Sequence, residues 1–346
     1  MAGLLVAVLV ATLLATQGRS APSLPRVSAR ALVTSAIRAA SRNGPVSGTA
    51  SVHLDLELPS LPSSETGPGT GPLGVLSELS GDHTLRVWRS RVGVRIAELL
   101  PAAERAVFAS RHATWLWDST DMTASRVIPP NTSGTEPRPP QATGPVDPEA
   151  LSARALRAIT PTTAVTVGRP AAVAGRPVYP LVLHPRTSRT LVGAVEVDVD
   201  GATRIPLRVA ITARGASGPA ISSTFRSVRF DPIDPSVFSF TPPPGSRVKT
   251  IRAPSPPERH SGTSPSRRTS SRVRTFGHGW ASIVAVRIPS LSVIAAKRPS
   301  AEELLRFLPY TGPVLSVRLA DRAGHAWVVA GLVPQSALAA VGSRLP

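Results

Sequence analysis

The strongest constraint on the fold is a two-residue alternation that runs from Val46 to Leu58. Apolar residues and glycine fill the even-numbered positions, and polar or charged residues fill the odd-numbered ones. This period predicts one long strand with an apolar face and a solvated face. A strand of this kind belongs to an antiparallel sheet that is covered on one side only.

Helical spacing occurs just before this strand and again in the middle of the chain. Ser28 can cap a helix that runs to Ser41, and Asn43-Gly44 ends it. Asp147 and Pro148 are a cap and a first-turn proline for a second helix that runs to Ile159.

Many further strands are predicted, which makes the fold class α+β. Before residue 250 they cover residues 83–89, 92–99, 106–109, 113–118, 163–167, 178–183, 191–199, 207–211, 221–230 and 237–240. After residue 275 the pattern predicts strands at 280–288, 314–319 and 326–333, and helices at 300–307 and 334–341. The chain therefore divides into a large domain at residues 27–250 and a small α+β domain at residues 276–346. A basic linker rich in Pro, Ser and Arg separates them at residues 251–275.

Residues 1–21 predict export. An uninterrupted apolar run from Leu4 to Leu14 has the length of a signal-peptide core and is too short to span a membrane. No basic residue precedes it, and the first is Arg19, so a short retained anchor is the alternative to a cleaved signal. Either one places the protein outside the cytoplasm, secreted or held at the cell envelope.

The residues needed for catalysis or metal binding are missing from the sequence pattern. The chain has no cysteine, which excludes disulfides and thiolate chemistry, and none of its seven histidines lies within four residues of another. Asp55 and Glu57 share one face of a single strand, where charge is expected on a wet surface. A G-x-G-x-x-G match at residues 69–74 follows a Pro- and Ser-rich loop, without the strand and helix that a dinucleotide site needs. We therefore predict no catalytic residues, no metal and no cofactor.

The net charge of +18 is carried almost wholly by arginine, since only Lys249 and Lys297 are lysines. The arginines are scattered except in the linker, and aromatic residues make up only 4% of the chain. Both facts argue against a nucleic-acid surface. An anionic membrane surface fits the charge.

The sheet is too wide for its two predicted helices to cover. Each helix is about 20 Å long, whereas ten strands at about 4.8 Å spacing form a face more than about 40 Å wide. Part of the apolar face is therefore expected to stay open for a flexible apolar ligand.

Several segments, in this order, resemble one family of exported proteins. They are SGDHTLRVW (80–88), TWLWDS (114–119), VAGRPVYPLVL (173–183), IPLRV (205–209), FSFTPPPGSRV (238–248) and AWVVAGLVPQSALAAVGSRL (326–345). They are similar to the LolA and RseB/MucB superfamily of extracytoplasmic lipoprotein carriers, in its actinobacterial exported form. The resemblance implies a curved antiparallel half-barrel with helices on its concave face, followed by the small C-terminal domain.

The resemblance also implies a non-catalytic role, as a carrier or sensor that binds a lipid or the acyl chain of a lipoprotein. The alternative is a regulatory protein that docks a membrane anti-sigma factor of an envelope-stress sigma system, without ligand. Apolar strand positions are the candidate lipid-binding residues, and closed core packing is the alternative reading of each. They are Val52, Leu54, Leu56, Leu85, Val87, Trp115, Trp117, Val195, Val197, Leu207 and Val209.

Overall fold

The computed structural model describes residues 23–42, 44–57, 80–110, 113–128, 161–252, 273–288, 308–322 and 325–346. Residues 1–21, most of the basic linker and the predicted helices at 147–159 and 300–307 lie outside these ranges, so those predictions stay predictions. Within the ranges, no helix is both long and apolar enough to cross a membrane.

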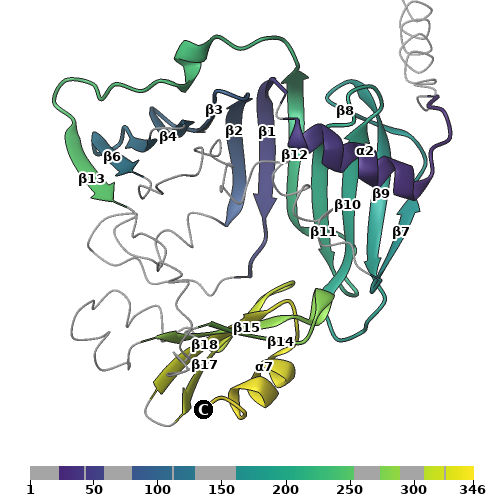
Figure 1. The fold of residues 1–346 in the computed structure, drawn as a ribbon. Coiled ribbons are helices and arrows are strands. Elements are labelled where there is room, and N and C mark those ends of the chain that lie inside the picture. The colour runs from purple at the N-terminus through teal and green to yellow at the C-terminus, as the bar shows by residue number, and fades with distance from the viewer. Residues whose placement is uncertain are drawn as a thin grey trace, which may run out of the picture.

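The larger part of the described chain is one 13-stranded sheet, open and curved (Figure 1). Its strands are β1 (Val46–Leu54), β2 (Gly81–Arg89), β3 (Gly93–Leu100), β4 (Ala103–Ser110), β5 (Thr114–Asp118), β6 (Thr123–Ile128), β7 (Thr163–Val167), β8 (Ala171–Val173), β9 (Arg176–Pro185), β10 (Val192–Asp200), β11 (Pro206–Ala213), β12 (Pro219–Arg229) and β13 (Arg247–Arg252). The order across the sheet is β13-β6-β5-β4-β3-β2-β1-β12-β11-β10-β9-β7, and β8 pairs with β9. β13 pairs with β6 in parallel, and the other pairings of this sheet are antiparallel. The predicted α+β class with a curved, largely antiparallel sheet is confirmed.

The strand register divides the sheet into two faces. Val52 lies opposite Ser223, which lies opposite Val209, which in turn lies opposite Val197. Paired residues point to the same side, so these residues share a face that we call the helix face. The reverse side is the outer face.

Helix α2 (Ala29–Ser41) covers one end of the helix face, as predicted. Ser28 caps it by accepting a hydrogen bond from the Ala31 N–H at 3.3 Å. Leu32 and Ala36 point from the helix into the core, where they pack with residues of β9 and β10 such as Leu181 and Val197. Figure 1 shows α2 lying across β12 to β9, away from β2 to β6.

The first strand is shorter than predicted, because it ends at Leu54 and not at Leu58. The Asp55 carboxylate accepts a hydrogen bond from the Glu57 N–H at 3.3 Å, and Glu57 has a φ of 46°. A local side-chain turn of this kind competes with the strand ladder, so the chain leaves the sheet although the alternation continues.

A second difference concerns residues 237–240, which are not a strand. The 3-10 helix η1 (Pro235–Phe238) forms there because Asp234 accepts a hydrogen bond from the Ser236 N–H at 2.8 Å and Pro235 begins the turn. Phe240, which follows η1, stacks against Phe108 with ring centroids 4.7 Å apart. The η1 segment therefore lies on the outer face of β3 to β5.

A smaller sheet forms the C-terminal part and carries a helix on one face. Its strands are β14 (Val273–Phe276), β15 (Ile283–Ile288), β16 (Tyr310–Thr311), β17 (Ser316–Arg322) and β18 (His325–Gly331), in the order β14-β15-β18-β17-β16. The 3-10 helix η2 (Gly279–Ala281) takes the start of the strand predicted at 280–288. Helix α7 (Gln335–Gly342) packs Leu338 against Trp327 and Val329. Strands β13 and β14 occupy the two ends of the range predicted as a linker.

Among the described residues, hydrogen bonds join the two sheets at three places. The Trp280 indole N–H donates to the Thr163 hydroxyl at 2.8 Å, and both residues are buried. The Leu332 carbonyl accepts from the Leu191 N–H and from the Thr190 hydroxyl. The Tyr310 hydroxyl donates to the Leu56 carbonyl. These contacts hold the second sheet against β7, the β9–β10 turn and the end of β1.

Candidate functional site

The structure places most of the predicted lipid-binding residues together on the helix face. Eight lie on strands of this face: Val52, Leu54, Leu85, Val87, Val195, Val197, Leu207 and Val209. Leu56 follows β1 and packs against the same core. Trp115 and Trp117 do not join them, because Leu116 between them pairs with Val107 on the helix face. Both tryptophans therefore lie on the outer face.

The eight strand residues are core residues, since none has more than 8% of its surface exposed. They belong to two packed clusters, one of which includes Leu32 and Ala36 of α2. Their burial favours the structural role for each of them over direct contact with a ligand.

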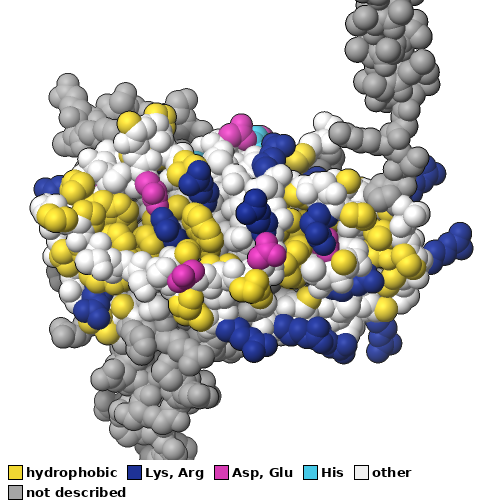
Figure 2. All heavy atoms as spheres, turned by 90° about the horizontal axis from the view of Figure 1, so that it is seen from above, with side chains coloured by type: hydrophobic (Ala, Val, Ile, Leu, Met, Phe, Trp, Pro, Cys, Tyr) yellow, Lys and Arg dark blue, Asp and Glu magenta, His cyan; other side chains and the backbone are white. Residues whose placement is uncertain are grey.

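The same face continues beyond α2 as a more open surface, which the sequence analysis did not single out. It consists of Val107, Leu116, Val127 and Ile251, and we call it the open floor. Leu116 is 42% exposed and Ile251 is 49% exposed. Register pairs Val107 with Leu116 and Val127 with Ile251, so the four residues share the helix face of β4, β5, β6 and β13. Figure 2 views the molecule from above, the side on which the segment between β12 and β13 lies in Figure 1, so the hydrophobic side chains that gather there at the end near β4 and β6 belong to the outer face and not to the open floor.

Two pairs of polar side chains lie next to the open floor, and one exposed cation lies at its edge. Arg105 donates to the Asp118 carboxylate at 2.9 Å. Burial acts to raise the pKa of Asp118, but hydrogen bonds from Thr120 and Arg105 outweigh it, and the pKa lies below its usual value. His83 and Glu98 form a second pair, with Nδ1 and Oε1 2.6 Å apart. Lys249 of β13 is exposed and pairs in register with Ser125, which places a cation at the edge of the floor.

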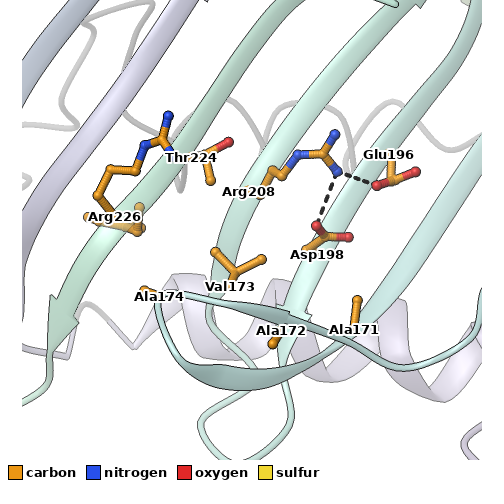
Figure 3. A pocket seen from close by; sticks show the side chains of 10 residues that line it. Ala171, Ala172, Val173, Ala174, Glu196, Asp198, Arg208, Thr224 and Arg226 are labelled. Atoms are coloured by element: carbon orange, nitrogen blue, oxygen red, sulfur yellow. Dashed lines mark hydrogen bonds and ion pairs between the residues drawn. The ribbon is translucent and has the colours of Figure 1, made fainter. Parts of the chain in front are cut away.

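The outer face holds a polar pocket of about 430 Å³ beside β8 (Figure 3). Arg208 donates from Nη1 to the Glu196 carboxylate and to Asp198 Oδ2, the latter at 3.1 Å. Only 5% of the Asp198 side chain is exposed, and its Oδ1 has no hydrogen-bond partner among the described residues. Burial raises the pKa of Asp198 to about 6, and the charge of Glu196 adds to the shift while Arg208 opposes it.

The described residues contain no cluster of three or more His, Asp or Glu that could hold a metal ion. Two of the described histidines each pair with one carboxylate: His53 with Asp82 at 2.8 Å, and His83 with Glu98.

Comparison with known structures finds proteins of the family that the sequence resembles. No family model matches the chain, and no curated protein matches its sequence. The structure of the Pseudomonas aeruginosa MucA/MucB complex is similar over 91% of this chain and 96% of that chain, with 15% identity and a TM-score of 0.47. The LolA superfamily protein NE2245 from Nitrosomonas europaea is similar over 62% of this chain and 99% of its own, with 9% identity and a TM-score of 0.24.

A putative outer membrane lipoprotein-sorting protein domain from Vibrio parahaemolyticus is similar over 61% of this chain and 97% of its own, with 13% identity and a TM-score of 0.25. At these identities and TM-scores, the similarity says nothing about the ligand or the partner of this chain.

Proposed function

We propose that this chain is an exported, non-catalytic protein that binds the acyl chain of a lipid or lipoprotein on the open floor. The observation that carries the proposal is the division of one continuous apolar face. Helix α2 packs on the end of the sheet at β9 and β10, while Leu116 and Ile251 stay exposed at the other end. Apolar strand residues exposed side by side lose water contact when a hydrocarbon chain lies on them, which is favourable by about 0.8 kcal/mol per buried methylene.

The chemistry of the floor supports an amphiphile with an anionic head. Its centre is aliphatic and offers no directional hydrogen bonds, so it suits a flexible chain and not a rigid polar molecule. Exposed Lys249 lies at its edge, where it can meet an acidic headgroup. The Arg105–Asp118 pair is already neutralised and adds no net charge.

The test measures the affinity for an uncharged fluorescent probe, N-phenylnaphthylamine. It also identifies the lipids that are extracted from protein purified from its native envelope. The affinity of the variant Leu116→Gln/Ile251→Gln for the probe should be lower than that of the parent by about tenfold or more, because two apolar contacts are lost. Val284→Gln is the matched control, since Val284 is a 39% exposed strand residue on the second sheet. Unchanged probe binding in the double variant, with no lipid in the extract, would refute the proposal.

The second candidate function is docking of a membrane anti-sigma factor through residues 276–346 and the basic linker at residues 251–275. Val273 and Val284 favour it, because they are 52% and 39% exposed on the second sheet. Deletion of residues 252–346, or the change Val273→Gln/Val284→Gln, should abolish pull-down of the partner and leave probe binding intact. Pull-down that survives both changes would contradict docking at this surface.

A further inference from the structure

A second hollow opens on the outer face over β4, β5 and β6, beside the η1 segment. Its volume is about 600 Å³, which is within the range of small-molecule sites. Phe108 and Trp115 of the sheet and Phe238 and Phe240 of the η1 segment line it. It lies on the other side of β5 from the open floor, because Trp115 and Leu116 are neighbours in one strand and point to opposite faces.

The aromatic walls of the hollow are fixed by packing. Phe108 and Phe238 are 6% and 4% exposed. Phe240 lies between the rings of Phe108 and Trp115, with centroid distances of 4.7 Å and 5.5 Å. Gly93 lets the segment approach this closely, since a Cβ at Gly93 would lie 3.0 Å from the Cβ of Phe238. The hollow is therefore preformed and does not depend on a ligand to assemble it.

The charge at its rim has one sign. Arg91 and Arg126 line the hollow and are exposed, and no acidic residue is among its described lining. Arg91 uses its Nε to donate to the Arg42 carbonyl at 3.3 Å, and the Arg126 guanidinium lies 5.7 Å from the Trp115 ring centroid. Neither forms an ion pair with a carboxylate in the described part of the chain. Other arginines of this face do so, as Arg95 does with Glu104.

We propose that this hollow binds an organic anion with a flat apolar body, such as an aromatic carboxylate or sulfonate. The ring of the ligand lies against the aromatic side chains that line the hollow, and its acidic group meets Arg91 and Arg126. A guanidinium pair without carboxylate partners leaves a net positive site, which favours an anion over a neutral molecule of the same shape. This site is separate from the open floor and does not depend on the function proposed for it.

The test compares two probes of similar shape on the full chain carrying Leu116→Gln/Ile251→Gln, so that binding at the open floor does not contribute: anilinonaphthalene sulfonate, which is an anion, and N-phenylnaphthylamine, which is neutral. The variant Arg91→Gln/Arg126→Gln should weaken sulfonate binding about tenfold or more and leave the affinity for the neutral probe within about twofold. Arg86→Gln removes an exposed arginine elsewhere on the outer face and should change neither affinity. Sulfonate binding to the unaltered chain should also weaken with added salt.

Each outcome decides the proposal. Loss of sulfonate affinity in the double variant, but not in Arg86→Gln, supports it, and a thermal unfolding midpoint unchanged from the parent chain shows that the variant is folded. Equal sulfonate affinity in the parent and the double variant overturns it, as does the absence of sulfonate binding to the parent. An equal loss of affinity for both probes in the double variant also overturns it, because the site would then not distinguish an anion from a neutral molecule. Leu116→Gln/Ile251→Gln should leave sulfonate binding intact, so failure of this site and failure of the open floor are distinguishable.

Discussion

At the scale of single residues, Asp198 is the most unusual group in the large sheet. Its carboxylate is buried beside Glu196, and one oxygen is bound by Arg208 while the other has no described partner. Burial makes the charged form costly, so the pKa of Asp198 in the fold is about 6, against 3.8 for an unperturbed aspartate. The folded protein therefore holds a proton here that the unfolded chain releases between pH 4 and pH 6.

This difference predicts a specific pH dependence of stability. The folded-state pKa is raised, so the contribution of Asp198 to stability is greatest below about pH 4 and declines as the pH rises through about 6. Asp198→Asn removes this dependence while keeping a hydrogen-bond acceptor for Arg208. The free energy of unfolding of each protein is measured in urea. The difference between the variant and the parent should shift by about 3 kcal/mol in favour of the variant from pH 4 to pH 7. A difference between Asp198→Asn and the parent that does not change with pH over this range would contradict the assignment.

At the scale of elements, the sequence predicts well those helices and strands that are set by their own hydrophobic period and end signals. The strand predicted at 163–167 has the same bounds as β7, and the capped helix predicted at 28–41 is α2. The 237–240 segment was predicted wrongly, since Asp234 and Pro235 set a 3-10 turn before the apolar residues begin. Strand β13 was missed because its partner β6 lies more than a hundred residues away in the chain. Strand β6 pairs with its neighbour β5 but has no strong period of its own, so it was missed as well.

The site was predicted less well than the fold, for a related reason. Alternation shows that Trp115 and Trp117 share a face, but Leu116 is also apolar, so the sequence does not tell which face is which. Register with Val107 decides it, and register depends on distant pairing. The signal that could have found the open floor is Leu116 itself, an apolar residue between two tryptophans.

The packing of α2 gives a prediction at this scale. Leu32 has no exposed surface and packs against β9 and β10, so Leu32→Ala should lower the free energy of unfolding by about 2–5 kcal/mol. Thr34→Ala, two residues on and exposed, should change it little. Urea unfolding followed by circular dichroism measures both. Equal effects of the two substitutions would mean that α2 is not docked on the sheet as described.

At the scale of the whole molecule, the two sheets are joined by a small number of buried polar contacts. The Trp280–Thr163 hydrogen bond is the most enclosed, with Trp280 8% and Thr163 7% exposed. A buried hydroxyl that loses its donor costs free energy, because it has no water to replace it. This bond therefore couples the stability of the second sheet to that of β7.

Two tryptophans of the second sheet provide a matched test of this coupling. Trp280→Phe keeps an aromatic ring but removes the indole N–H, so it should destabilise the protein by about 1–3 kcal/mol. Trp327→Phe is the control, because the Trp327 N–H is buried without a partner among the described residues and its removal breaks no hydrogen bond. Thermal unfolding should separate the two variants. A larger loss in Trp327→Phe would show that ring volume, and not the bond, dominates.

The described contacts between the sheets reach only one half of the large sheet. They reach β7, the β9–β10 turn and the end of β1, so the second sheet acts as a brace for the same half that α2 covers. Strands β3 to β6 and β13, which carry the open floor on one side and the aromatic hollow on the other, have no such brace among these contacts. Because the two surfaces of this half share one layer of strands, a change of curvature there that widens one would narrow the other.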